Sequence, residues 1–77
     1  MKNVTIYSTQ ECVKCKKTKD FFKEHKVNFT EKDVGSDINA ARMMVEKSGQ
    51  MSVPVIEIDD KIIVDFDETK LRELLNI

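Results

Sequence analysis

Residues 4–15 of this 77-residue chain read VTIYSTQECVKC, and this stretch decides the fold. In residues 4–7, β-branched and aromatic side chains alternate with the period of a β-strand, and a short polar loop follows. Beyond Val13 the apolar residues recur every three or four positions, which predicts a helix. The stretch is therefore a strand that passes through a loop into a helix, and the pair Cys12-x-x-Cys15 lies where the helix begins.

The first helix is predicted from Val13 to about Lys26. Its apolar face carries Cys15, Thr18 and Phe22, and lysines fill the opposite face. Residues 27–34 alternate again and predict a second strand. Because two strands joined through a helix normally lie parallel with a right-handed crossover, these elements predict a β-α-β unit.

A second helix is predicted between Ser36, which is a good N-cap residue, and Gly49, which accepts the left-handed conformation found at helix C-termini. Asp37 would lie in its first turn, where the helix dipole favours a negative charge. Its buried stripe is expected to consist of Ile38, Ala41, Met44, Val45 and Ser48.

The last third of the chain predicts two more strands and one more helix. Strands at residues 55–58 and 61–64 are separated by Asp59-Asp60, which suits a tight hairpin because Asp tolerates positive φ. Asp67 is expected to cap the final helix. The apolar face of that helix is formed by Leu71, Leu74 and Leu75. The resulting order, β-α-β-α-β-β-α, predicts an α/β fold with a four-stranded mixed sheet flanked by three helices.

Length and composition limit the classes of protein that this chain represents. With 77 residues, 40% of them apolar, it is expected to form a single domain over residues 1–77. The net charge of −1 argues against nucleic acid as a partner. The longest apolar run, Ile62–Val64, is too short to cross a membrane. Residues 1–4 alternate and predict no secretory signal, so we expect a reducing, cytoplasmic location.

Two cysteines are too few for a disulfide scaffold, and in a reducing compartment such a pair is more often catalytic or metal-binding. The spacing Cys12-x-x-Cys15 is close to one helical turn, so the sulfurs lie near enough to bond. Cys12 is expected at the helix start, where unpaired N–H groups, the helix dipole and nearby lysines stabilise a thiolate. Such settings lower a cysteine pKa from about 8.5 to roughly 3.5–7.5. We therefore predict that Cys12 is the exposed nucleophile and Cys15 the resolving thiol.

Other uses of the cysteines stay open on spacing alone. A zinc site needs four ligands, whereas this chain offers two cysteines and His25, so no metal is predicted within one chain. His25 is expected at the surface or packed at an edge of the helix. Two chains together would bring enough thiols for a [2Fe–2S] cluster held across a dimer. The cysteines could also be buried and inert, or form a sensor that reacts once.

The element order, the N-terminal Cys12-x-x-Cys15 and the later triplet Ser52-Val53-Pro54 together resemble the glutaredoxin branch of the thioredoxin superfamily. The resemblance covers essentially the whole chain and implies a thioredoxin-like fold. Position alone favours a trans Pro54 at a strand start, whereas the resemblance implies a cis proline that faces the cysteines. It also implies that Val53 offers its backbone N–H and C=O groups to an extended substrate.

Several positions depart from the glutathione-using members of that family. Val13-Lys14 stands where they commonly have Pro-Tyr, and Val64-Asp65 stands where they have a glycine pair. Thr9 and Met51-Ser52 occupy places where they carry basic residues. Because Asp65 adds a negative charge, binding of an anionic tripeptide is expected to suffer. Cys12-Val13-x-Cys15 followed by Thr18-Lys19 is more similar to the small glutaredoxin-like redoxins that donate electrons to ribonucleotide reductase and are reduced by thioredoxin reductase.

The resemblance implies a dithiol–disulfide oxidoreductase that has no bound cofactor and reduces disulfides in a protein substrate. Its electrons would come from a thioredoxin-reductase-like flavoprotein. Glutathione stays open as the alternative source, because Lys14 supplies one positive charge. We expect a monomer with no nucleic acid or membrane partner. The residues expected to contact the substrate are Tyr7, Val13, Lys14, Met51, Ser52, Val53, Pro54, Asp65 and Asp67.

Three of these residues have a second interpretation. Tyr7 is at least as consistent with a strand residue that packs on the sheet as with one that flanks the cysteines. Asp67 needs no role beyond that of a helix cap. Met51 is either apolar filling at the rim of the core or an adaptable docking contact.

Overall fold

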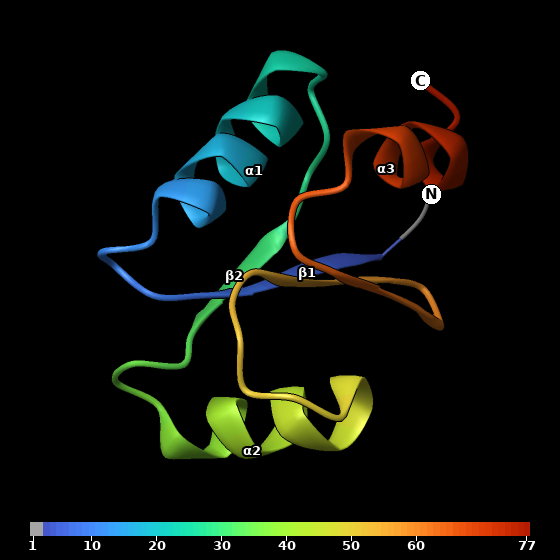
Figure 1. Cartoon of the computed structure of the whole chain (residues 1–77). Coiled ribbons are helices and arrows are strands. Elements are labelled where there is room, and N and C mark those ends of the chain that lie inside the picture. The colour runs from blue at the N-terminus through green and yellow to red at the C-terminus, as the bar shows by residue number, and fades with distance from the viewer. Residues whose placement is uncertain (1–2) are drawn as a thin grey trace.

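One four-stranded sheet separates two layers of helices in the computed structural model, which describes residues 3–77 (Figure 1). The elements in chain order are β1 (Val4–Ser8), α1 (Val13–Glu24), β2 (Thr30–Asp33), α2 (Ile38–Ser48), β3 (Val55–Ile58), β4 (Lys61–Val64) and α3 (Glu68–Leu75). The predicted order β-α-β-α-β-β-α and the mixed sheet are therefore confirmed.

The structure tests the expectation about membrane-spanning segments, but it describes only part of the segment on which the expectation about export depends. Across residues 3–77, no helix has the length and apolar character needed to cross a membrane. The expectation that no secretory signal is present depends partly on Met1 and Lys2, which lie outside the described residues.

The strands lie in the order β2-β1-β3-β4, so the first strand of the chain is a central one. β1 runs parallel to β2, as expected for two strands joined through a helix. β3 runs antiparallel to both β1 and β4. Asp59 in the hairpin turn adopts a φ of 55°, the left-handed conformation that this turn was predicted to use.

The register of the strands brings three segments to one end of the sheet. Tyr7 lies opposite Val55, so the loop that leads to Cys12 and the segment that ends in Pro54 leave the sheet at the same end. Val55 in turn lies opposite Val64, which brings the end of β4 to that end as well. Residues far apart in the sequence therefore meet around the start of α1.

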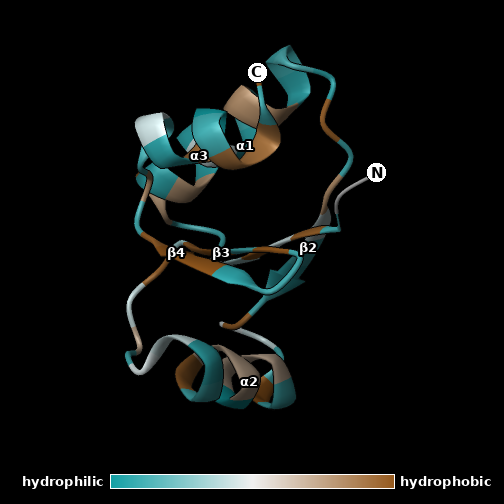
Figure 2. Cartoon of the chain, turned by 90° about the vertical axis from the view of Figure 1, so that its right-hand side faces the viewer, coloured by the Kyte–Doolittle hydropathy of each residue, from teal (hydrophilic) through white to brown (hydrophobic). Residues whose placement is uncertain are grey.

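Alternation along β1 divides the apolar side chains between two cores. α1 and α3 cover one face of the sheet and α2 covers the other, as both views show (Figure 1, Figure 2). The core beneath α1 and α3 is formed by Val4, Ile6, Phe21, Phe22, Ile56, Ile58, Ile63 and Leu71. The smaller core beneath α2 is formed by Tyr7, Ala40, Met44 and Val55. Neighbouring residues of a strand thus face opposite layers.

The first helix is shorter than predicted, and the second strand begins later. The N–H of Lys26 donates to the carbonyl of Lys23, and the N–H of Val27 donates to that of Phe22, at 3.1 and 2.8 Å. With Lys26 at a φ of 57°, this is a Schellman motif, which closes α1 at Glu24. Because Val27 belongs to that motif, pairing with β1 starts only at Thr30.

The start of the second helix is shifted by one residue from the prediction. Ser36 and Asp37 both donate their N–H groups to the carbonyl of Asp33, so the turn after β2 extends through Ser36. Asp37 is therefore the N-cap. Its carboxylate accepts hydrogen bonds from the backbone N–H groups of Asn39 and Ala40, at 3.0 and 3.1 Å. The stripe shifts accordingly, because Ala40 is buried and Ile38 is 75% exposed.

Other predicted helix ends agree with the structure. Gly49 has a φ of 75° and ends α2 in the left-handed conformation. Asp67 caps α3, with its carboxylate accepting a hydrogen bond from the N–H of Lys70 at 3.2 Å. Leu71 is fully buried, and Leu74 and Leu75 pack partly buried against the same core.

The capping assignment for α2 predicts different effects for two adjacent substitutions. Asp37→Ala removes both cap hydrogen bonds and should lower the free energy of unfolding by about 1 kcal/mol. Ser36→Ala, the matched control, should change it by less than roughly 0.5 kcal/mol, as is usual for surface substitutions. Urea denaturation followed by circular dichroism measures both values. An equal loss in the two variants would show that the cap is assigned to the wrong residue.

Candidate active site

Cys12 is the N-cap residue of α1. Its backbone is extended, with φ −91° and ψ 113°, and its sulfur accepts a hydrogen bond from the backbone N–H of Cys15 at 3.1 Å. The carbonyl of Cys12 accepts from the N–H of Lys16 at 3.1 Å, which completes the first turn. The sulfur thus occupies the acceptor position that a capping oxygen fills in other helices. A negative charge there is favoured by the free N–H groups and by the helix dipole.

The two cysteines differ in their access to solvent. Cys12 is half-buried, whereas Cys15 is fully buried in the helix face that packs on the sheet, and both are free thiols. Burial, and after it the hydrogen bond with Cys12, raise the pKa of Cys15 to about 12. At neutral pH the proton therefore stays on Cys15, and Cys12 is the more accessible of the two sulfurs.

A polar network that the sequence patterns did not reveal joins β1, α1 and β2 through the carboxylate of Glu31. The hydroxyl of Ser8, at the end of β1, donates to the carboxylate of Glu31 at 2.9 Å, and Lys19 donates to the same oxygen at 2.7 Å. These two bonds lower the pKa of Glu31, and the carboxylate raises the pKa of Lys19. The positive charge of Lys19 also acts on Cys15, where it opposes the effect of burial on the pKa.

The peptide bond between Val53 and Pro54 is cis. The trans isomer favoured by position alone is therefore wrong, because a strand-start pattern carries no information about which isomer the tertiary contacts select. Pro54 is fully buried, and its carbonyl accepts a hydrogen bond from the N–H of Asp65 at 2.9 Å. Val53 remains half-buried. That Val53 binds substrate through its backbone stays a prediction.

An ion pair joins the first turn of α1 to the end of β4. The ammonium of Lys14 lies 3.1 Å from one carboxylate oxygen of Asp65, and both side chains are at least half exposed. The other oxygen of Asp65 accepts the N–H of Phe66 at 2.7 Å. That hydrogen bond and the bond from Lys14 hold the pKa of Asp65 below its usual value. The two charged residues that the sequence placed near the site are thus in contact.

The remaining predicted contact residues fall into two groups. Val13, Met51 and Ser52 are exposed, with Val13 at 70% and Met51 at 76%. Tyr7 is only 1% exposed and belongs to the core beneath α2, so it packs on the sheet, and its contact with substrate stays a prediction. Asp67 serves as the cap of α3.

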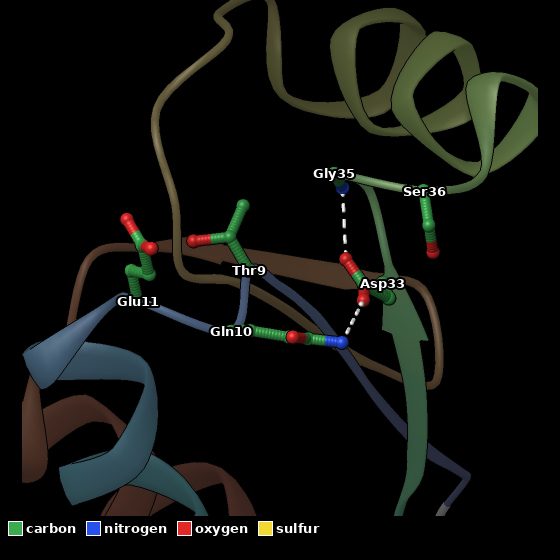
Figure 3. A pocket seen from close by; sticks show the side chains of 6 residues that line it. All are labelled: Thr9, Gln10, Glu11, Asp33, Gly35 and Ser36. Carbon is green, nitrogen blue, oxygen red and sulfur yellow. Dashed lines mark hydrogen bonds between the residues drawn. The ribbon is translucent and has the colours of Figure 1, made fainter.

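An open hollow of about 510 Å³ lies beside the loop that leads to Cys12 (Figure 3). Asp33 braces it by accepting hydrogen bonds from the N–H of Gly35 at 2.9 Å and from the amide of Gln10 at 3.4 Å. The lining residues are Thr9, Gln10, Glu11, Asp33, Gly35 and Ser36. The sequence patterns missed this hollow because it forms only when β1 and β2 pair and bring two distant loops together.

The donor set for a metal ion is small. Within residues 3–77, no three side chains of His, Cys, Asp or Glu gather closely enough to hold a metal ion. His25 packs against the ring of Phe21, with 4.6 Å between the ring centroids, on the face of α1 that meets α3.

A protein-family model and two curated relatives agree on the family of this chain. The family model described as Glutaredoxin matches residues 4–63. A glutaredoxin-like 8.6 kDa protein in the rubredoxin operon of Clostridium pasteurianum is 39% identical over 72 residues, which are 94% of this chain and 96% of that protein. The glutaredoxin-like protein NrdH of Lactococcus lactis subsp. cremoris is 31% identical over 71 residues, 92% of this chain and 97% of that protein.

Solved structures show the same architecture. The crystal structure of Methanosarcina acetivorans methanoredoxin superposes with a TM-score of 0.90 at 30% identity, over 97% of this chain and 85% of that one. The glutaredoxin of Archaeoglobus fulgidus superposes with a TM-score of 0.84 at 29% identity, over 100% of this chain and 89% of that one. Both superpositions extend over nearly all of the chain, which confirms the predicted fold.

The contrast between the cysteines predicts their order of alkylation. Below pH 7, iodoacetamide should label Cys12 of the reduced protein well before Cys15, as mass spectrometry of timed digests would show. Because the pKa of Cys15 is raised to about 12, mainly by burial, only a very small fraction of this residue is thiolate at pH 7. Since that fraction grows with pH, Cys15 labelling in a Cys12→Ser variant should rise steadily up to pH 10. Equal rates for both residues at pH 7 would contradict the assignment.

Proposed function

We propose, because this chain belongs to the glutaredoxin family of thiol–disulfide oxidoreductases, that it is a small redoxin which reduces protein disulfides through Cys12 and Cys15. The observation that carries the proposal is the 3.1 Å contact between the Cys15 N–H and the Cys12 sulfur. It combines a half-buried sulfur at the positive end of a helix with a fully buried thiol one turn behind it. This is the arrangement that two-step disulfide exchange needs.

In the first step, the Cys12 thiolate attacks one sulfur of the substrate disulfide. A mixed disulfide forms, and the other substrate sulfur leaves as a thiolate, which takes up a proton. In the second step, Cys15 loses its proton and attacks the Cys12 sulfur, which releases the second substrate thiol. Two electrons have then moved from the protein to the substrate, and the protein holds a Cys12–Cys15 disulfide.

The electrostatics of Cys15 suit this order of events. Part of its raised pKa comes from the hydrogen bond with Cys12 and from the charge on the Cys12 sulfur. Both contributions disappear when that sulfur becomes part of a neutral mixed disulfide. The positive charge of Lys19 remains and favours the Cys15 thiolate. Formation of the mixed disulfide thus makes the second thiol easier to ionise at the moment when it must attack.

A thioredoxin-reductase-like flavoprotein is the proposed source of electrons, in a reducing cytosol, for a monomer without a bound cofactor. The similarity to the glutaredoxin-like protein NrdH supports this choice. The charges support it as well, because Lys14 is already paired with Asp65 and is not free to replace the cations that glutathione-using relatives carry. Glutathione is the alternative reductant, and the two are separated by a direct assay.

The proposed roles of the two cysteines predict distinct variants. Cys12→Ser should reduce insulin no faster than dithiothreitol alone, since the attacking sulfur is absent. Cys15→Ser keeps that sulfur but cannot resolve the intermediate, so a covalent adduct with the substrate should accumulate. Mass spectrometry detects the adduct, and dithiothreitol should release it. Full turnover by Cys12→Ser, or an adduct on Cys15 in that variant, would overturn the assignment.

The proposed reductant predicts the outcome of two parallel assays. NADPH with thioredoxin reductase should support insulin reduction at least about tenfold faster than NADPH with glutathione and glutathione reductase, because one missing cation contact weakens binding by about that factor. NADPH oxidation at 340 nm measures both rates. A glutathione rate that saturates, together with no rate from the flavoenzyme, would make glutathione the electron donor.

A further inference from the structure

We propose that Asp65 determines which disulfides this redoxin accepts: by neutralising Lys14 beside the cysteines, it discriminates against disulfides that carry carboxylates near the sulfurs. The inference rests on the proposed function and assigns it a substrate class, namely neutral or cationic disulfides.

The ion pair lies between the two segments that are expected to hold substrate. Lys14 is in the first turn of α1, between Cys12 and Cys15, and its ammonium lies 3.1 Å from the carboxylate of Asp65. The N–H of Asp65 donates to the carbonyl of Pro54 at 2.9 Å. A substrate that reaches the Cys12 sulfur while extended along the segment before Pro54 therefore passes this pair.

The backbone conformation of Asp65 and two contacts of its side chain hold its carboxylate in place. Its φ is 69°, in the left-handed region where glycine has the lowest cost and where Asp and Asn are tolerated. The carboxylate is fixed twice, by the N–H of Phe66 at 2.7 Å and by Lys14. An aspartate is ionised at neutral pH at its ordinary pKa, and these two bonds lower the pKa of Asp65 from that value. A negative charge is thus held in place at the edge of the site.

Lys14 is the lysine between the two cysteines, and its ammonium is already occupied by Asp65. An incoming carboxylate has to displace Asp65 to reach the ammonium, and it is repelled by Asp65 as it approaches. The hollow beside the Cys12 loop is lined in part by the acidic residues Glu11 and Asp33, and its lining residues include no lysine or arginine. The carboxylates of Asp65 and of this hollow thus oppose an anionic substrate beside the Cys12 loop, and they do not oppose a neutral or cationic one.

The pair is exposed enough for its effect to appear in substrate rates more than in stability. Ion pairs in solvent contribute little to folding free energy, so removing the charge of Asp65 should leave the fold intact. Charges at the rim of a binding site act mainly on association rates and on their dependence on salt. Asp65→Asn is suited to the test, because Asn has the same shape and tolerates the left-handed conformation.

The test uses the pre-reduced protein and three small disulfides of different charge: oxidised glutathione, which is net negative, bis(2-hydroxyethyl) disulfide, which is neutral, and cystamine, which is positive. In each reaction the two protein thiols become a disulfide and the probe becomes two thiols. At low ionic strength, Asp65→Asn should raise the rate with oxidised glutathione about three- to tenfold relative to the neutral probe. It should lower the relative rate with cystamine by a similar factor. Salt at about 1 M should reduce both changes.

Three further variants separate charge from structure. Lys14→Gln should shift the relative rates in the opposite direction, and the double variant should return them close to the wild-type values. Glu68→Gln, the matched control, breaks the exposed ion pair with Arg72 on α3 and should leave all three rates unchanged. A purely structural role for Asp65 would change all three probes by the same factor.

The outcomes distinguish this inference from the proposed function. Wild-type reduction of the neutral probe, combined with relative rates that stay the same in Asp65→Asn and Lys14→Gln, would overturn the charge selection and leave the redoxin function standing. A wild-type protein that reduces none of the three probes and no insulin would overturn both.

Discussion

A hydrogen bond from the backbone N–H of Cys15 to the sulfur of Cys12 organises the reacting end of this protein. The same contact does two things. It satisfies one of the free N–H groups at the start of α1, as a capping side chain must. It also brings a developing negative charge on sulfur to the positive end of the helix. A serine or aspartate at position 12 would cap the helix equally well, but only a cysteine makes the cap a nucleophile.

The hydrophobic core supplies the asymmetry between the two cysteines. Cys15 lies on the same helix face as Thr18 and Phe22, both of which are fully buried. Packing of α1 on the sheet therefore removes Cys15 from water and raises its pKa, while the N-cap position leaves Cys12 accessible. The proposed exchange thus needs no dedicated acid or base at this stage, because helix geometry and burial favour Cys12 as the sulfur that reacts first.

Features that depend on residues within one turn of one another were predictable from the sequence. Gly49 at the end of α2, Asp67 at the start of α3 and the placement of Cys12-x-x-Cys15 all belong to this class. The predicted N-cap of α2 was wrong by one residue. The N–H groups of Ser36 and Asp37 both donate to the carbonyl of Asp33, and no local preference separates these two residues as caps.

Features that depend on strand pairing could not be predicted in this way. The sequence left two interpretations of Tyr7 open, packing on the sheet or flanking the cysteines, because its burial depends on which layer covers each face of β1. The isomer at Pro54 became predictable only through the family resemblance. The hollow beside Thr9 requires the turn after β2 to approach the loop after β1. Each of these features joins segments whose distance along the chain carries no periodic signal.

The ion pair near the site shows how such long-range contacts change a conclusion about function. Taken separately in the sequence, Lys14 adds a cation that would attract glutathione, and Asp65 adds an anion that would repel it. The register of β3 and β4 places Val64 opposite Val55, and this brings the next residue into contact with both Pro54 and α1. The two charges then cancel, so a count of cations overstates what a ligand meets. In this proposal the reactivity is determined at the start of α1, whereas the charge that a substrate meets depends on Asp65, which follows the edge strand β4. A substitution at position 65 can therefore alter substrate selection without altering the cysteines.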